Sequence, residues 1–597
     1  MILKNSAPEK SQLNILLSYF QNQQYLKAEK LALSITQKYP RHQYAWKILA
    51  AVFEQTDRVS EALLANQEAL KIEPNDPEVH LCLGNNFNLL GRMNEAELSY
   101  KRSIKLDPNY FQAYYNLGFI QKKMQRYEES ASNYRHAIKL KPDFPQGYYN
   151  LGLTLIELNS LYEALENLKK AIKIKPNYFQ AFFHLSIVNR ILGQKKEALT
   201  NLQKAITINP KYVRAYNALG VTLVELGRYE EAIQNFQEAI SLDQKYEEGY
   251  NNLGNSFKDL GRFDEALEYY KKAIDLDPEN PENLNNFGRF LLLINNFKEA
   301  FKFMEWRLKM EELNFIPLKT LKPRWHGDDK KKIFLLKEQG IGDQIMFSSM
   351  IPELHENADK LIVECDHRIL PIFQRSLPNN IKFITDRMDI GDNEYDCHIP
   401  IGSLPLHFRK ELSDFKKSSR GWIKADQDKV KNIRQNIIQN KLKKIIGVSW
   451  RTSSLLSHSH LRNIELVTML EPLKNLDLIF VNLQYGEVSN EINNLRSEHG
   501  IEVLEIPGLD LFSDIDGLAA LISACDFIIS IDNLNSHFAG ALGVKTMLLL
   551  PKVADERWGL ESNKTYLYDS LVLYRQSSYN NWNEPLKKIK TDIQNLV

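Results

Sequence analysis

The sequence contains little cysteine, and the cysteines that it has stand far apart. Cys82, Cys365, Cys397 and Cys525 are the only four in 597 residues, and no two have the spacing of a metal-binding CxxC pair. Their neighbours are apolar or mixed, which is typical of buried thiols. Neither a disulfide framework nor a zinc site is therefore expected to organise the fold.

The sequence also lacks an excess of charge of either sign. Its 76 Lys and Arg residues against 75 Asp and Glu residues give a formal net charge of +1, so electrostatics indicates neither a nucleic-acid partner nor an anionic membrane. No window approaches the roughly 18 apolar residues that span a bilayer. The first ten residues have no apolar core of signal-peptide length. We expect a cytoplasmic protein with no integral membrane segment.

What the sequence does have is a repeat of 34 residues. A chain of this length exceeds the size at which one hydrophobic core keeps growing, so at least two structural units are expected. One proline column keeps the step, with a single gap of twice the period: Pro40, Pro74, Pro108, Pro142, Pro176, Pro210 and Pro278. A column of small residues keeps it too: Ala50, Gly84, Gly118, Gly152, Ser186, Gly220, Gly254 and Gly288.

This pattern resembles the tetratricopeptide repeat, a helix pair in which small residues set the helix crossing and proline ends the second helix. Residues 8–312 are therefore predicted to form an all-α solenoid of about nine helix pairs. The concave face of such a solenoid can hold an extended polypeptide or a partner protein.

One polar column in the repeats is a candidate peptide-binding site. The residue two positions before each small residue reads Cys82, Asn116, Asn150, His184, Ala218, Asn252 and Asn286. An asparagine amide can pair with both the N–H and the C=O of a peptide backbone. The repeats resemble those of protein O-GlcNAc transferases, in which an asparagine ladder holds the substrate polypeptide in this way. Asparagine is also common in this repeat, so the column alone does not decide between the two interpretations.

The pattern changes after the repeats. Two prolines and a charged turn indicate a linker at residues 313–332, after which short apolar runs alternate with helical segments. This alternation predicts two doubly wound α/β halves with parallel sheets, at residues 333–425 and 426–597. The strand candidates are KIFLL, LIVEC, IKFI, YDCHIPI, KIIGVSW, DLIFVNL, IEVLEI, DFIISI and TMLLLP. Ligands of such sheets bind beyond the carboxyl ends of the strands.

Two segments combine a strand end with a helix start. In EQGIGDQIMF, Gly340 and Gly342 would let backbone approach a ligand, and Asp343 either does chemistry or caps the helix. In SIDNLNSHFAG, a strand ends at Asp532 and a helix start follows, whose N–H groups and dipole suit a diphosphate. Four polar residues lie at this helix start. Asn533, Asn535 and Ser536 are uncharged donors, and His537 is either a ligand contact or a structural residue.

Eight stretches resemble, in the same order along the chain, the heptosyltransferase-like glycosyltransferases that are fused to tetratricopeptide repeats in bacteria. They are PRWHG, EQGIGDQIMF, IPIGSLP, GVSWR, VNLQYG, DNLNSHFAGALGVKTMLLLP, ERWG and LYRQSSYNNW. The resemblance implies a GT-B fold of two Rossmann-like halves. The first half, residues 333–425, would admit the acceptor, and the second, residues 426–597, would hold the nucleotide sugar.

The resemblance also implies residue roles. Asp343 takes the place of the general base that removes the proton from the acceptor hydroxyl. At a helix N-terminus such a carboxylate should be ionised and a weak base, so proton transfer would come late. Two arginines are candidates for stabilising the leaving diphosphate: Arg462, at the position where related families place a basic phosphate contact, and Arg451, directly after the strand candidate KIIGVSW. The alternative for either is an ordinary surface arginine. Relatives carry an Arg where this chain has Ser349, and WYPS where it has YLYDS, which leaves the donor and the acceptor open.

Metal signals are poor. The DID at 514–516 precedes an apolar helix, where Asp residues serve as caps, and the HSH at 458–460 has no third ligand. We therefore expect a metal-independent, inverting glycosyltransferase without cofactor, which moves a sugar from a nucleotide donor to an acceptor hydroxyl on a protein held by the repeats. Two alternatives remain open: a transferase of surface glycan or lipopolysaccharide, and a non-catalytic repeat scaffold.

Overall fold

The computed structural model describes residues 7–310, 318–327, 330–417, 420–438, 443–452, 461–560, 562–578 and 581–596. The chain divides into two compact units, Met1–Asp243 and Gln244–Val597. Each is considered by itself.

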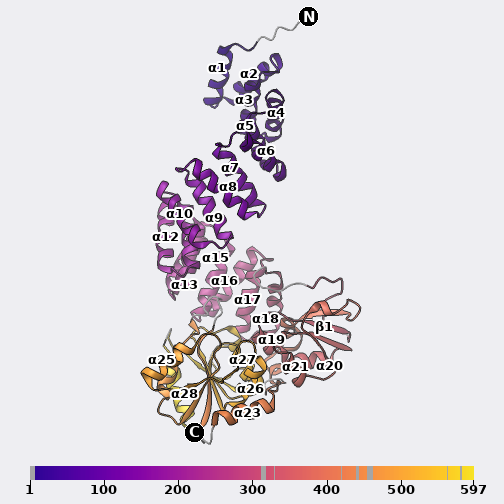
Figure 1. Cartoon of the computed structure of the whole chain (residues 1–597), viewed down its shortest axis with the longest axis vertical. Helices are drawn as coiled ribbons and strands as arrows, with labels where there is room; N and C mark the ends of the chain where they lie inside the picture. The colour runs from indigo at the N-terminus through magenta and orange to yellow at the C-terminus, as the bar shows by residue number, and fades with distance from the viewer. Residues whose placement is uncertain are drawn as a thin grey trace. The chain divides into compact units, whose positions relative to one another are not determined.

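The first unit consists of paired helices, each odd-numbered helix packing on the next even-numbered one (Figure 1). The helices are α1 (Lys10–Gln21), α2 (Tyr25–Lys38), α3 (Gln43–Gln55), α4 (Val59–Ile72), α5 (Pro77–Leu89), α6 (Met93–Leu106), α7 (Phe111–Lys123), α8 (Tyr127–Leu140), α9 (Pro145–Glu157), α10 (Leu161–Ile174), α11 (Phe179–Ile191), α12 (Lys195–Ile208), α13 (Val213–Val224) and α14 (Tyr229–Leu242). The prediction of an all-α solenoid is confirmed.

The small-residue column does what its spacing predicted. A Cβ on Gly84 would lie 2.4 Å from the Tyr100 ring, and one on Gly220 would lie 2.5 Å from the Phe236 ring. Both distances are far below contact, so the two helices of each pair approach closely only because these positions lack a side chain.

The second unit begins with four more repeat helices and continues into two parallel sheets. The helices are α15 (Glu247–Asp259), α16 (Phe263–Leu276), α17 (Pro281–Leu293) and α18 (Phe297–Met304), followed by a 3-10 turn, η1 (Glu305–Lys309). The first sheet has the order β3-β2-β1-β4 and the second β10-β9-β8-β5-β6-β7, and every strand pairing is parallel. The predicted α/β class with two parallel sheets is confirmed.

The strands are β1 (Lys332–Leu336), β2 (Lys360–Glu364), β3 (Lys382–Ile384), β4 (Cys397–Pro400), β5 (Lys444–Ser449), β6 (Leu478–Asn482), β7 (Val503–Leu504), β8 (Phe527–Ile531), β9 (Thr546–Leu550) and β10 (Leu571–Arg575). All predicted runs contain a strand, and β10 was not predicted.

Helices cover both sheets. They are α19 (Ile341–Ser348), α20 (Ile351–Glu356), α21 (Leu370–Ser376), α22 (Pro405–Phe408), α23 (Gln427–Ile438), α24 (Leu466–Leu470), α25 (Ser489–His499), α26 (Ile515–Ala524), α27 (Leu534–Leu542) and α28 (Asn583–Gln594). Short 3-10 turns connect them: η2 (Arg387–Asp389), η3 (Ile401–Ser403), η4 (Leu412–Lys417), η6 (Glu471–Leu473) and η7 (Glu556–Trp558). One buried apolar cluster runs through both halves and joins Ile333 and Ile345 of the first to Phe538 and Leu548 of the second.

The last repeat is bound to the α/β part by buried charge. Arg307 of η1 is 4% exposed, and its Nε and Nη2 donate to Glu338 Oε1 and Oε2 at 2.6 and 2.8 Å. Glu338 lies just after β1 and is also 4% exposed. Arg289 of α17 makes a second bidentate pair with Glu556 of η7. The last repeats and the α/β part therefore lie in one compact unit. The predicted linker, residues 313–332, lies between them in sequence. Of this stretch and its start, residues 311–317 and 328–329 lie outside the described residues.

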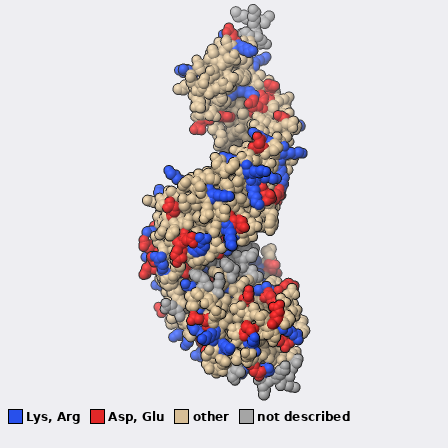
Figure 2. Space-filling model, turned by 90° about the vertical axis from the view of Figure 1, so that its left-hand side faces the viewer, with Lys and Arg blue, Asp and Glu red and all other residues tan. Residues whose placement is uncertain are grey.

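Charges of both signs cover the surface. Figure 2 shows Lys and Arg beside Asp and Glu over much of the face in view, which agrees with the net charge of +1.

We predict that Arg307→Ala strongly destabilises the second unit. It leaves Glu338 as a buried uncompensated charge, which costs about 3–5 kcal/mol. Six of the seven tryptophans lie in the second unit, all but Trp46, so unfolding followed by tryptophan fluorescence in denaturant reports on it.

The matched control is Lys302→Ala, which removes a pair with Glu299 whose side chains are 51% and 42% exposed. That pair is worth at most about 1 kcal/mol. Equal losses for the two variants would contradict the role assigned to the buried pair.

Candidate functional site

The glycine loop lies at the carboxyl end of β1 and opens α19. Gly340 is the N-cap of this helix, with φ −78°, and Gln339 before it has φ +60°. Gly342 faces α27, because a Cβ there would lie 3.6 Å from His537 and 3.7 Å from Leu534. The glycine that was predicted to admit a ligand therefore lies where the helices of the two halves pack together.

Asp343 is not the helix cap. It is the third residue of α19, the cap position is Gly340, and its Oδ1 accepts a hydrogen bond from Arg557 Nη1 at 3.1 Å. Its side chain is 22% exposed. Of the two interpretations weighed for Asp343, the cap is thus wrong, and a carboxylate held by an arginine of the other half takes its place.

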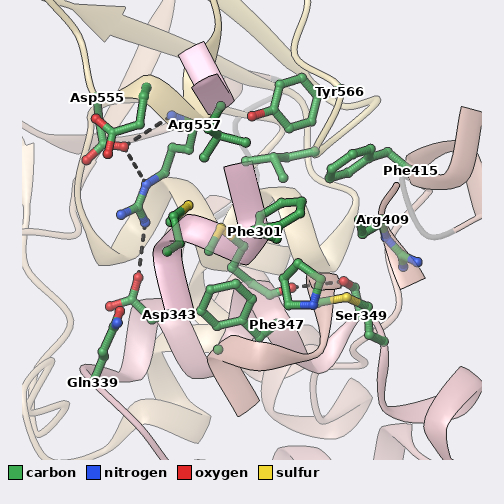
Figure 3. Close-up of a pocket in the computed structure, with 18 of the residues that line it drawn as sticks. Phe301, Gln339, Asp343, Phe347, Ser349, Arg409, Phe415, Asp555, Arg557 and Tyr566 are labelled. Carbon is green, nitrogen blue, oxygen red and sulfur yellow. Dashed lines mark hydrogen bonds and ion pairs between the residues drawn. The ribbon is translucent and has the colours of Figure 1, made fainter. Parts of the chain in front are cut away.

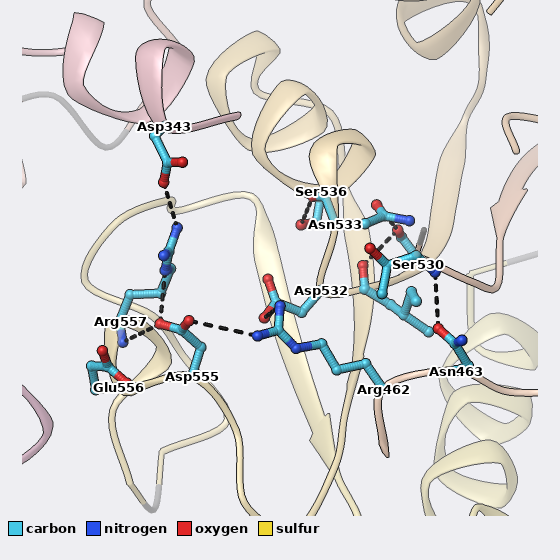
Figure 4. A network of polar contacts seen from close by, with 12 residues as sticks. Asp343, Arg462, Asn463, Ser530, Asp532, Asn533, Ser536, Asp555, Glu556 and Arg557 are labelled. Carbon is cyan, nitrogen blue, oxygen red and sulfur yellow. Dashed lines mark hydrogen bonds and ion pairs between the residues drawn. The ribbon is translucent and has the colours of Figure 1, made fainter. Parts of the chain in front are cut away.

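Asp343 is one end of a chain of alternating charges that crosses both halves (Figure 4). Arg557 Nε donates to Asp555 Oδ1 at 2.8 Å. Asp555 Oδ2 lies 3.8 Å from Arg462 Nη2, and Arg462 Nη1 lies 2.9 Å from Asp532 Oδ2. Three carboxylates and two guanidiniums therefore form a network with one negative charge in excess.

Burial and pairing move the pKa values of this network in opposite directions. Burial raises the pKa of Asp532, and Arg462 only partly opposes it. Burial also acts on Asp555, but Arg557, Arg289 and Arg462 together outweigh it and lower its pKa. Asp555 is therefore the firmly ionised centre of the network, and Asp532 is the carboxyl that most readily takes a proton.

The polar groups at the start of α27 are engaged inside the second half. Asn533 caps the helix by accepting from the Asn535 N–H at 3.0 Å, and its Nδ2 donates to Ser449 Oγ at 2.8 Å. Asn535 Nδ2 donates to Ser449 Oγ and to the Leu483 carbonyl, both at 2.9 Å. Ser536 Oγ donates to the Asn533 carbonyl at 2.7 Å. These side chains join β5 and β8 to the helix. Because the Asn535 and Ser536 N–H groups are already engaged by Asn533, the helix dipole is the main feature left to attract an anion.

His537 is buried between the halves. Its Nδ1 lies 2.8 Å from the Tyr568 hydroxyl, and its ring stacks on Trp558 with centroids 5.3 Å apart. Burial, with Arg557 and Arg462 adding to it, lowers the His537 pKa to about 3. The imidazole is therefore neutral at pH 7.

The two predicted phosphate-binding arginines have protein partners. Arg462 pairs with Asp532 and Asp555, as above. Arg451 pairs with Glu491 at 2.7 Å, and its Nη2 donates to the Glu487 carbonyl at 2.7 Å. Arg451 is thus directed to α25 and its approach loop, while Arg462 belongs to the network around Asp532.

A pocket of about 830 Å³, counting the part open to solvent, lies beside Asp343 (Figure 3). Its walls come from α17, α18 and η1 of the last repeat, from α19, and from the segment before β10. Figure 3 shows the Asp343–Arg557 pair on one side, Arg409 and Ser349 on the other, and the rings of Phe301 and Phe347 between them. A carboxylate thus lines a largely apolar pocket.

A second pocket of about 520 Å³ lies where β6 and β7 end. Asn482, Gln484, Tyr485 and Gly486 line it from β6 and the loop that follows, and Asp510 lines it from the other side. This is the carboxyl edge of the second sheet, where ligands of doubly wound sheets bind.

The asparagine column is only partly available to a peptide. Asn116 Nδ2 donates to Asn85 Oδ1 at 2.8 Å, and Asn150 Nδ2 donates to the Tyr115 hydroxyl at 2.7 Å. Both bonds join neighbouring repeats. Asn252 and Asn286 lie half-buried on α15 and α17. At least two of the four amides therefore have a structural role.

Neither a metal cluster nor a membrane span is found in the described part of the chain. No three His, Cys, Asp or Glu residues come together there as metal ligands, and no helix there is long and apolar enough to cross a membrane. The HSH at 458–460 lies outside the described residues. Metal independence and the cytoplasmic location stay predictions.

Sequence reasoning missed Arg557 as a site residue. It lies within the quoted ERWG, and nothing in that segment indicates its partners, Asp343 and Asp555.

We predict that His537 makes the second unit less stable in mild acid. The folded pKa lies below the value of about 6.5 for an unfolded histidine, so the stabilisation is complete above pH 6.5 and is lost as the pH falls toward 3. From pH 7 to pH 5 the loss is about 2 kcal/mol at roughly 1.4 kcal/mol per pH unit.

Melting followed by tryptophan fluorescence at pH 7, 6 and 5 measures this loss. His537→Gln should be less stable at pH 7 but melt with a weaker pH dependence. His367→Gln, at a side chain 78% exposed, should keep the wild-type dependence. An unchanged slope in His537→Gln would contradict the assignment.

Comparisons with known proteins match the repeats. Models described as tetratricopeptide repeat match residues 13–77, 145–178, 247–280 and 269–302, and one described as TPR repeat matches 84–125, 122–158, 188–227 and 222–261. Protein FlbA of Caulobacter vibrioides is 26% identical over 293 residues, which cover 46% of this chain and 48% of that protein. The chain thus spans about half the length of this relative.

Two solved structures are similar over a smaller part. The crystal structure of MamA is 26% identical, with a TM-score of 0.26, and covers 27% of this chain and 95% of that one. YrrB, described as a TPR protein with an unusual peptide-binding site, is 22% identical, with a TM-score of 0.29, and covers 31% of this chain and 95% of that one. The family matches show that the first half of this chain consists of tetratricopeptide repeats, as its 34-residue period predicted.

Proposed function

We propose that the chain is a glycosyltransferase of GT-B architecture that transfers a sugar from a nucleotide donor to the hydroxyl of a polypeptide acceptor. The observation that carries the proposal is the position of Asp343. Its carboxylate lies at the carboxyl edge of the first sheet, lines an apolar pocket and is held by an arginine of the second half.

Asp343 has the geometry of a general base. Oδ1 is taken by Arg557, and among the described residues Oδ2 has no hydrogen-bond donor, so Oδ2 is the atom that would receive a proton. Proton transfer comes late, when the attacked sugar carbon has gained positive character and the hydroxyl has become acidic.

The second half supplies the donor side. The pocket at the ends of β6 and β7 suits the nucleoside, since Tyr485 offers a ring face and backbone groups of the loop after β6 line it. The start of α27 attracts the diphosphate. In the reaction the acceptor oxygen bonds to the sugar carbon, the bond from that carbon to the phosphate oxygen breaks with its electron pair going to the diphosphate, and the acceptor proton goes to Asp343.

Arg462 and Arg557 are the cationic groups of the network that would face the leaving diphosphate. Arg462 and Arg557 are held close to the donor side by Asp532 and Asp555. Their guanidiniums remain charged at all working pH values and present donors in fixed directions. Fixed positive groups stabilise developing negative charge without reorganising during the step.

The repeats would bind the protein that carries the acceptor. Stacked helix pairs form extended concave surfaces that suit polypeptides. Asn252 and Asn286 are the members of the asparagine column nearest in sequence to the α/β part, and the amides of Asn116 and Asn150 bridge repeats.

A non-catalytic repeat scaffold is the second candidate. The observation in its favour is that Asn533, Asn535 and Ser536 are engaged in holding the start of α27, so these donors are not ready to meet a phosphate. On this reading the α/β part turns over no nucleotide sugar.

We predict that Asp343→Asn lowers sugar transfer by about 10²–10⁴-fold, the contribution of a general base. The assay incubates the full chain with a panel of nucleotide sugars and its co-purified proteins, and measures release of nucleoside diphosphate and the mass gained by protein. Nucleotide binding should change little, because the amide keeps the shape of the side chain.

Asp477→Asn is the matched control, since Asp477 is 69% exposed and pairs with Lys443 at the surface. It should retain full transfer. Undiminished transfer in Asp343→Asn would remove Asp343 from the mechanism, and no turnover of any donor by the wild-type chain would favour the scaffold.

A further inference from the structure

The pocket beside Asp343 is built to hold a bulky apolar group. Its walls include Phe301 and Met304 from the last repeat and Met346 and Phe347 from α19. Trp422 closes another side, stacked on Tyr568 with ring centroids 5.6 Å apart and planes 11° from parallel. Aromatic rings and flexible methionines suit an apolar guest of variable shape.

The charged groups that line this pocket are already matched by partners in the protein. Arg307 pairs with Glu338, and Asp343 and Asp555 both pair with Arg557. In addition, Arg409 pairs with Glu353 at 2.7 Å, and Glu556 pairs with Arg289. An anionic guest would compete with these carboxylates for each arginine and would have to be desolvated to enter. The pocket therefore disfavours phosphorylated or carboxylated acceptors.

One polar group in the pocket wall awaits a partner. The Tyr566 hydroxyl is buried, and no hydrogen bond to it is found among the described residues. Burial raises its pKa well above the usual value, so it remains a neutral hydroxyl. Figure 3 shows it turned toward the side on which Arg557 lies. A buried hydroxyl without a partner costs free energy, and a guest carbonyl or amide would recover it.

The walls of the pocket also point to a polypeptide guest. α17 and α18 are the last helices of the repeat array, so one wall of the pocket is formed by helical repeats, a kind of structure whose surfaces commonly bind polypeptides. The unpartnered tyrosine hydroxyl suits a peptide carbonyl, which a hydrocarbon chain lacks.

We propose that this pocket binds a bulky apolar side chain next to the acceptor hydroxyl of a polypeptide, and that the transferase selects serine or threonine flanked by aromatic or long aliphatic residues. This deepens the proposed function and rests on it. The side chain enters between the last repeat and α19, the Tyr566 hydroxyl donates to a backbone carbonyl of the acceptor, and the acceptor hydroxyl reaches Asp343.

The test measures peptide binding to the full chain without any donor, by saturation-transfer NMR titration. The probes are acetyl-Phe-Ser-Phe-amide, acetyl-Glu-Ser-Glu-amide, glucose 6-phosphate and a dodecyl maltoside kept below its micelle concentration. We expect the phenylalanine peptide to bind at least tenfold more tightly than the glutamate peptide and the sugar phosphate. Equal or tighter binding of either anionic probe, or tighter binding of the dodecyl chain, would overturn the proposal.

Two variants locate the binding. Ser349→Trp puts a large ring into the pocket and should abolish binding of the phenylalanine peptide, whereas Leu64→Trp, at an exposed side chain of the first unit, should leave it unchanged. Tyr566→Phe keeps the ring and should weaken binding about fivefold, the value of one hydrogen bond of about 1 kcal/mol. Unchanged affinity in both Ser349→Trp and Tyr566→Phe would place the peptide elsewhere.

These outcomes are separable from those of the proposed function. If the phenylalanine peptide binds with the expected variant effects but no nucleotide sugar is turned over, the pocket stands and the transferase fails. If donor is turned over while the peptide preference is absent, the transferase stands and the acceptor specificity fails.

Discussion

Two ion pairs, one buried and one with a partly exposed arginine, bind the last repeat to the loops that carry the candidate site. Arg307 holds Glu338, which lies five residues before Asp343, and Arg289 holds Glu556, which precedes Arg557. Buried charges are stable only with their partners, so neither loop can move away from the repeat without leaving a charge uncompensated. The end of the solenoid is in this sense part of the site.

This constraint explains why the site combines segments from three parts of the chain. The repeat contributes an apolar wall, the first half contributes a carboxylate at a strand end, and the second half contributes the arginine that holds it. The pocket presents no unpaired charge to a guest, because the charged residues that line it are paired with other residues of the protein. Binding of a guest in this pocket is then decided by shape and apolar contact.

Much of the fold could be predicted from the sequence, because its signals are local. The 34-residue period, the small residues under Tyr100 and Phe236, and the apolar runs of the buried parallel strands all follow from neighbouring residues. β10 was missed although residues 571–574 form a short apolar run; it is an edge strand of the second sheet.

The candidate site was only partly predictable, because its contacts join distant residues. Asp343 was found from its loop, but Arg557, its partner, stands 214 positions away. The same holds for Arg462, whose pairing with Asp532 no spacing in the sequence reveals.

Thermal melting of the full chain with UDP, GDP, ADP, dTDP or CMP, with and without EDTA, tests the central claim most directly. The account predicts that one nucleotide raises the melting temperature of the second unit by mass action, equally in EDTA. The absence of a shift with all five would contradict it.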